Sequence, residues 1–223
     1  YSYLPVGASA SNDNCFCPVA NLQFDLTRVD STISSYIVFV VNASVVPSVN
    51  DAIGFAPKEC FDRPILFVDD ESINTAYTIS ANSLQRCMKF GLPYLNPGSS
   101  TITLTYAAST RHVPSYGIMS MAKAALECWT RELACHLGPE GHRVNSISSG
   151  PIRTIAASGI PGFENILNHV ESNAPLRRNV TQSDVAGCTV WLASPLSSGV
   201  TGQCIHVDSG YSITMVPPSI LGE

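Results

Sequence analysis

Charged side chains are scarce in this chain. Lys, Arg, Asp and Glu make up 13% of its 223 residues, hydrophobic residues make up 45%, and the formal net charge is −5. So much apolar material with so little charge predicts a folded domain with a sizeable core rather than a disordered chain. The negative balance gives no electrostatic basis for binding nucleic acid.

Long apolar runs are missing as well. The longest candidate, Tyr36–Val41, is interrupted by Asn42. It is much shorter than the run of about 20 apolar residues that crosses a bilayer. Because no basic helix suited to a membrane surface is found either, the sequence predicts no membrane contact.

The eight cysteines form no CxxC pair. Cys15 and Cys17 are the closest two, and two reduced thiols in a loop explain them better than a metal site. HExxH, P-loop and paired-carboxylate patterns are also missing, so we predict no metal. Reduced thiols fit a cytoplasmic location, or a plastid in a eukaryote.

The chain does contain a strand pattern followed by a long helix pattern. Ser100–Thr105 is β-branched and predicts a buried strand. Ser115 is a candidate N-cap for a helix that reaches about Leu137 and stops at Gly138. Tyr116 and Lys123 lie almost two helical turns apart, so this pattern places them on one face of the helix.

Such a pair has a definite chemistry. An ammonium near a phenol favours the phenolate and lowers the tyrosine pKa. A phenol poised in this way can donate a hydrogen bond or a proton to an oxygen that gains negative charge. Taken alone, the same spacing also fits a tyrosine that caps the core and a lysine in solvent. Tyr106, at the end of the predicted strand, is placed to reach the same cleft.

These residues carry a family resemblance. The run Tyr106…Tyr116…Lys123, followed by VNSISSGPIRT at 144–154, resembles the enoyl-acyl carrier protein reductases, a divergent branch of the short-chain dehydrogenase/reductase superfamily. Ordinary members of that superfamily use Tyr-x3-Lys, whereas here the fourth residue after Tyr116 is Ser120. The resemblance is closest to the bacterial, NADH-using type. It continues through Gly54–Pro57, Leu95–Ser99, Ala156–Phe163 and Ser194–Gly210.

The resemblance implies an α/β fold with a Rossmann-like, doubly wound parallel sheet in three layers. Further elements fit it: a helix over 71–94, strands over 144–147 and 203–207, and a helix to Ala193 opened by a Thr181/Asp184 capping box. His206 is predicted to be a packed residue of the last strand.

The beginning of the chain departs from the family. Residues 1–53 contain a single glycine, Gly7. A complete dinucleotide-binding fold opens with a strand, a glycine-rich turn and a helix that receives the pyrophosphate. We therefore expect residues 1–223 to form one partial domain that lacks this first βα unit. Residues 32–41 favour a strand where the family has a helix, and Pro47, Asn50 and Asp51 stand where it has a buried strand.

The resemblance also implies roles for individual residues. Tyr116 stabilises the thioester oxygen, Lys123 holds the cofactor ribose, and Tyr106 orients the thioester. Cofactor contacts are implied for Asp25, Leu26, Gly54, Lys123, Ile152 and Thr154. An acyl pocket is implied for Phe55, Ala56, Tyr106, Met119, Ala156, Ala157, Ile160 and Phe163, with residues 154–175 as a substrate-binding lid.

The implied activity is NADH-dependent reduction of the 2,3 double bond of an enoyl group on acyl carrier protein, by a homotetramer. Three alternatives stay open, and one of them is a chain that does not fold alone. The long Tyr–Lys spacing argues against a short-chain reductase acting on carbonyls. The missing glycine-rich turn is compatible with a catalytically inactive chain that only folds or associates with intact subunits.

Overall fold

The computed structural model describes residues 38–41, 48–154, 157 and 162–214, and one sheet runs through them. Its strands follow the order β1-β2-β3-β4-β5. Strands β2 to β5 are parallel, whereas β1 pairs antiparallel with β2. The predicted parallel sheet is therefore confirmed in β2 to β5, and β1 adds an antiparallel strand at the end of the order. The strands are β1 Val38–Val41, β2 Ser48–Asp51, β3 Ser100–Thr105, β4 Arg143–Ser149 and β5 Cys204–Val207.

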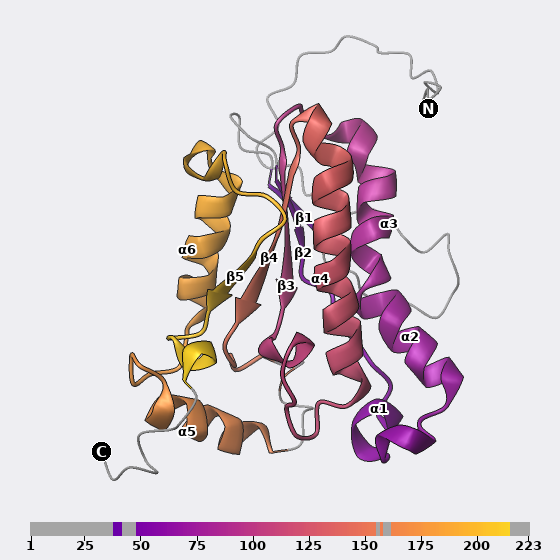
Figure 1. Ribbon diagram of the computed structural model, residues 1–223, viewed down its shortest axis with the longest axis vertical. Helices are drawn as coiled ribbons and strands as arrows, with labels where there is room; N and C mark the ends of the chain where they lie inside the picture. The colour runs from indigo at the N-terminus through magenta and orange to yellow at the C-terminus, as the bar shows by residue number, and fades with distance from the viewer. Residues whose placement is uncertain (1–37, 42–47, 155–156, 158–161, 215–223) are drawn as a thin grey trace, which may run out of the picture.

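Helices cover both faces of the sheet, which confirms the three-layer α/β prediction (Figure 1). Helices α2, α3 and α4 lie on one face and α6 on the other, while α5 lies beyond the carboxyl ends of the strands. The α-helices are α1 Glu59–Asp62, α2 Asp70–Ser80, α3 Asn82–Gly91, α4 Ile118–Leu137, α5 Phe163–Asn173 and α6 Gln182–Ala193. Short 3-10 turns are η2 Ile65–Phe67, η3 Leu92–Tyr94, η4 Ala107–Ser109, η5 Gly138–Glu140, η7 Pro195–Ser197 and η8 Tyr211–Ile213.

The sheet is buried from both sides. Val144 of β4 packs with Met88, Ala134 and Leu137 of the α3/α4 layer. Ile102, Ile147, Val185 and Leu192 form a second cluster between the sheet and α6. Such burial on both faces is typical of parallel sheets and explains why β3 and β4 could be predicted from apolar and β-branched runs.

The predicted helix over 71–94 is wrong as a single element. Helix α2 ends at Ser80 and α3 begins at Asn82, with Ala81 between them at φ −127° and ψ −54°. The hydroxyl of Ser80 accepts from the N–H of Phe55 at 2.8 Å and donates to its carbonyl at 2.7 Å. These two hydrogen bonds connect the end of α2 to the loop after β2.

The unusual segment before Gly54 does form a strand. Asn50 and Asp51 belong to β2, which pairs with β3 over Ser48–Asp51, and Pro47 lies outside the described residues. The capping box is confirmed: the Thr181 hydroxyl accepts from the N–H of Asp184 at 3.2 Å, and the Asp184 carboxylate accepts from the N–H of Thr181 at 2.8 Å. His206 is exposed on β5, so its predicted packing is wrong.

Within the described part of the chain, none of the helices has both the length and the apolar character that a membrane crossing requires.

Candidate active site

The carboxyl ends of β2, β3 and β4 meet at one edge of the sheet because these strands are parallel. Gly54 follows β2, Tyr106 follows β3 and Gly150 follows β4. Ligands of open α/β sheets bind outside this edge. The sequence motifs around these residues are therefore brought together by the topology.

Tyr116 does not belong to the helix that carries Lys123. Helix α4 begins at Ile118, with Gly117 as its N-cap at φ 50° and ψ −132°, and Ser115 has φ 62°. Ser115 as N-cap, and a face shared with Lys123 through helical periodicity, are therefore wrong predictions. The reason is a close approach: a Cβ on Gly117 would lie 2.2 Å from the carbonyl oxygen of Cys60.

The Tyr116 ring is buried beside Tyr106. Its side chain is 8% exposed and packs with Ala108, Met119 and Ala122. The two tyrosine rings lie 5.1 Å apart between centroids at an angle of 54°. Burial raises the pKa of Tyr116 above its usual value, and Tyr106 adds to the rise. The expected lowering by Lys123 is therefore wrong for this structure, and Tyr116 is a protonated donor at neutral pH.

Lys123 lies in the second turn of α4 and reaches the end of β3. Its side chain is 7% exposed, and its Nζ donates to the carbonyl of Leu104 at 2.8 Å. An ammonium has three donors, so two are left for a ligand. Burial lowers the pKa of Lys123 to about 8, against the attraction of Asp51 and Glu127, which raises it.

Two buried carboxylates accompany Lys123, and sequence reasoning missed both. Asp51 ends β2, and Glu127 lies one turn beyond Lys123 and accepts a hydrogen bond from Thr105 at 2.7 Å. By sequence alone, Asp51 is a residue unfavourable to a strand. The sequence did carry a signal for this carboxylate. It is a charged residue three positions before Gly54, in a segment expected to be buried.

Because it has no side chain, Gly54 leaves space beside the ammonium of Lys123. A Cβ at this position would lie 3.4 Å from Met119 Cε and 3.9 Å from Lys123 Nζ. Glycine thus keeps the approach to the ammonium open, as a ligand lying against the backbone requires. Phe55 is 53% exposed, and Ala56 packs against the clusters around Cys60 and Tyr116.

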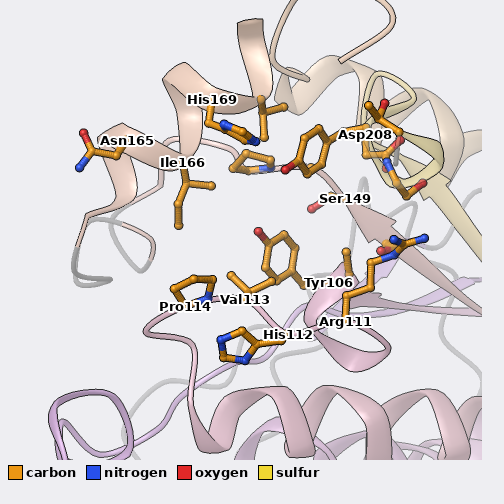
Figure 2. Close-up of a pocket in the computed structure, with 18 residues that line it drawn as sticks. Tyr106, Arg111, His112, Val113, Pro114, Ser149, Asn165, Ile166, His169 and Asp208 are labelled. Carbon is orange, nitrogen blue, oxygen red and sulfur yellow. The ribbon is translucent and has the colours of Figure 1, made fainter. Parts of the chain in front are cut away.

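A cavity of about 410 Å³ opens beside Tyr106. Figure 2 shows the Tyr106 ring extending into it, between the Arg111–Pro114 loop on one side and Ile166 and His169 of α5 on the other. Of the predicted pocket residues that the structure describes, Tyr106 alone lines this cavity. Those that do not line it are Phe55, Ala56, Met119, Ala157 and Phe163. The cavity is also lined by polar residues that the sequence did not indicate: Arg111, His112, His169 and Asp208.

The structure describes some of the residues that were predicted to contact the cofactor. Ile152 is half-buried against the cluster under α6. Thr154 is exposed, and its hydroxyl accepts from the N–H of Ala157 at 3.1 Å. Asp25, Leu26, Ala156 and Ile160 lie outside the described residues. Among the residues with a described placement, no group of His, Cys, Asp or Glu could hold a metal ion.

A parallel α/β sheet with a protonated tyrosine and a buried lysine at its carboxyl edge defines a protein of the short-chain dehydrogenase/reductase class. A family model described as enoyl-(acyl carrier protein) reductase matches residues 25–212. The chain belongs to this family.

Two bacterial relatives carry the name of the same family. The chain is 46% identical over 164 residues to the enoyl-[acyl-carrier-protein] reductase [NADH] FabI of Haemophilus influenzae, a match that covers 73% of this chain and 63% of the relative. It is 45% identical over 163 residues to the protein of the same name from Escherichia coli K12, covering 73% and 62%. The chain thus spans less than two thirds of the length of these curated relatives.

Solved structures support the fold. The Bacillus cereus enoyl-acyl carrier protein reductase, crystallised with NADP+ and indole naphthyridinone, superimposes with a TM-score of 0.74 at 41% identity, covering 76% of this chain and 66% of the other. The NADH-type enoyl-[acyl-carrier-protein] reductase of Aquifex aeolicus gives a TM-score of 0.73 at 36% identity, with the same coverage.

Proposed function

We propose that the chain reduces the 2,3 double bond of a trans-2-enoyl thioester on acyl carrier protein with NADH, in fatty-acid biosynthesis. The observation that supports this most strongly is Lys123, a buried ammonium with two donors left, which lies beside Gly54 and donates to the carbonyl of Leu104, two residues before Tyr106. When bound, the nicotinamide supplies the hydride. The protein supplies position and electrostatic stabilisation.

Lys123 binds the ribose hydroxyls of the cofactor. Gly54 lets the cofactor approach the backbone, and Ile152 and Thr154 contact the nicotinamide carboxamide and the pyrophosphate. Asp25 and Leu26 border the adenine. Gly54 follows β2, and Ile152 and Thr154 follow β4, at the carboxyl edge of the sheet, which is where a dinucleotide lies in this fold class.

The tyrosines act on the thioester. Tyr106 orients it, and Tyr116 donates a hydrogen bond to the oxygen on which enolate charge develops. Because burial raises the pKa of Tyr116, the phenol keeps its proton until that charge appears. Phe55, Ala56 and Met119 border the acyl chain.

Residues 154–175 form a lid over that chain and exclude water. Ala156, Ala157, Ile160 and Phe163 supply its small and apolar inner surface. Ile166 and Val170 of α5 already line the cavity beside Tyr106, which supports this placement.

The assembly is a homotetramer located in the cytoplasm, or in a plastid in a eukaryote. Several large apolar side chains are exposed in the single chain, among them Phe90, Tyr94, Trp191 and Leu196, and subunit contacts would cover such surface. Light scattering of the purified protein tests this, and a monomer at micromolar concentration contradicts it.

The function is tested with crotonyl thioesters of acyl carrier protein or coenzyme A and NADH, followed by loss of NADH absorbance. We expect turnover of the enoyl thioester and none of a panel of ketones. Turnover of ketones alone would instead identify a carbonyl reductase. No calorimetric heat at millimolar NADH would identify a chain that has lost catalysis.

Tyr116→Phe is expected to lower kcat about 10- to 100-fold while Kd for NADH stays unchanged. A hydrogen bond to a charged acceptor contributes about 1.5–3 kcal/mol, and each 1.4 kcal/mol corresponds to about tenfold in rate. Tyr77→Phe, on the partly exposed surface of α2, is the matched control and should keep wild-type kcat. Equal kcat in Tyr116→Phe and wild type would remove Tyr116 from the proposed mechanism.

A further inference from the structure

A buried carboxylate below Lys123 has no part in the proposed reaction. Asp51 is the last residue of β2 and is 1% exposed. Its Oδ2 accepts from the hydroxyls of Thr103 at 3.3 Å and Ser83 at 3.4 Å, and its Oδ1 accepts from the N–H of Ile53 at 3.4 Å. These neutral donors fix the carboxylate in place without supplying a positive charge. Burial disfavours the ionised carboxylate, and a nearby positive charge favours it beyond what these hydrogen bonds supply.

Lys123 is the cation that acts on Asp51. Burial raises the pKa of Asp51 to about 6, and the attraction of Lys123 opposes this rise. In return, Asp51 is the strongest influence that keeps the pKa of Lys123 from falling further below about 8. The two groups form no direct ion pair, because the ammonium donates to Leu104 instead. Both groups lie at the same two strand ends. Asp51 pairs with Thr103 of β3 and accepts from its hydroxyl, while Lys123 Nζ donates to the next residue, Leu104, and lies 3.9 Å from the position of a Cβ on Gly54.

One further carboxylate and two thiols lie around Asp51 and Lys123. Glu127 of α4 also attracts Lys123, more weakly than Asp51 does. Cys87 of α3 has its pKa raised to about 12 by burial and by Asp51, against Arg86, so it stays neutral. Burial also raises the pKa of Cys204 on β5, which lies near Glu127. Among the described residues, one cation therefore faces two carboxylates, and Asp51 dominates.

We propose that Asp51 is a positioning residue for Lys123: its carboxylate keeps the buried amine in the ammonium form and holds it at the carboxyl end of β3. Two N–H donors then remain available to the cofactor ribose. What Lys123 binds rests on the proposed function. The pairing itself concerns only groups of this chain and can be measured without a cofactor.

The test is the titration of Lys123 in Asp51→Asn, a variant that keeps the size and an acceptor oxygen but removes the charge. An amine reacts with acetic anhydride only when deprotonated, so the pH midpoint of acetylation at Lys123, followed by peptide mass spectrometry, reports its pKa. We expect a wild-type midpoint near pH 8. In Asp51→Asn the midpoint should fall by about one pH unit, because an attractive charge is lost.

Two further variants test whether the shift of the acetylation midpoint is specific to Asp51. Glu127→Gln should move the midpoint in the same direction by a smaller amount. Asp70→Asn, which changes an exposed carboxylate at the start of α2, should not move it. An unchanged midpoint in folded Asp51→Asn, or a larger shift in Glu127→Gln, would overturn the proposal.

A measurement on the wild-type protein covers the case in which Asp51→Asn does not fold. The side-chain carboxyl ¹³C signal of Asp51 should respond twice to rising pH: near pH 6, when it ionises itself, and near pH 8, when Lys123 loses its charge. Coupled groups show such double steps. A signal without the second step contradicts the pairing.

NADH affinity provides a readout that a merely structural role would not move. At pH 8, a fall of the Lys123 pKa from about 8 to about 7 lowers the ammonium fraction about fivefold, so Kd should rise about fivefold, and less at pH 6. An equal loss of affinity at both pH values would point to structural damage and overturn the positioning role. If the wild-type protein binds no NADH at all, the proposed function fails, while the acetylation and NMR results still decide the pairing.

Discussion

Replacing Lys123 with methionine is expected to weaken NADH binding by about 100- to 10,000-fold. Lys123 Nζ uses one donor on Leu104 and has two left for the ribose hydroxyls. A hydrogen bond from a charged group contributes about 1.5–3 kcal/mol, so two contribute about 3–6 kcal/mol. Each 1.4 kcal/mol corresponds to about tenfold in Kd. Isothermal calorimetry with NADH measures the loss directly.

The control is Lys89→Met. Lys89 lies on the exposed surface of α3 with its ammonium 5.6 Å from the centroid of the Phe90 ring, away from the carboxyl edge of the sheet. The same chemical change there should leave Kd for NADH at the wild-type value. Wild-type affinity in Lys123→Met would remove the residue on which the proposed function depends most.

The same substitution should also change the pH dependence of stability. Lys123 lowers the pKa of Asp51, so its removal raises this pKa further above about 6. A carboxyl whose pKa is higher in the folded than in the unfolded state binds more protons when folded, and stability then falls as pH rises through that range. Between pH 5 and pH 8, the stability of Lys123→Met against thermal unfolding should therefore fall more steeply with rising pH than that of wild type.

The elements predicted correctly are those whose signals are local. Strand β3 follows its β-branched run, α4 ends at Leu137 before Gly138, and α6 starts at the Thr181/Asp184 capping box. The prediction failed at contacts between distant segments. The Ser80 hydroxyl on Phe55 separates α2 from α3, and the carbonyl of Cys60 determines the backbone at Gly117. Sequence patterns within a window carry no record of such contacts.

The residues of the site also fall into those that could be predicted from the sequence and those that could not. The family resemblance led to Tyr106, Tyr116 and Lys123, and the structure gathers all three at the carboxyl edge of the sheet. It could not lead to Asp51, which departs from an apolar strand pattern and comes close to the Lys123 site only because β2 pairs with β3. Burial also reverses the sign of the Tyr116 pKa shift that the spacing alone suggested. Desolvation depends on the packed surroundings, so it cannot be derived from the identity of two residues.

Gly117→Ala is expected to destabilise the protein by about 2–6 kcal/mol. A non-glycine residue in such a positive-φ conformation costs roughly 1–3 kcal/mol. The new Cβ would also lie 2.2 Å from the carbonyl oxygen of Cys60, a backbone atom that cannot rotate away. Overpacking of this kind costs about 1–3 kcal/mol more. Against a total stability of about 5–15 kcal/mol, this is a large fraction.

Urea unfolding monitored by circular dichroism measures this loss, and Gly187→Ala is the matched control. Gly187 is exposed in the interior of α6, and a Cβ there would meet nothing within 4 Å. Alanine should therefore stabilise this helix by about 0.5–1 kcal/mol, the opposite sign for the same chemical change. Because Gly117 sets the start of α4 and the position of Tyr116 beside Tyr106, enoyl-thioester turnover by Gly117→Ala should fall even at low temperature, where the variant stays folded. A Gly117→Ala protein with the unfolding midpoint and turnover of wild type would show that this turn does not hold the tyrosine in place.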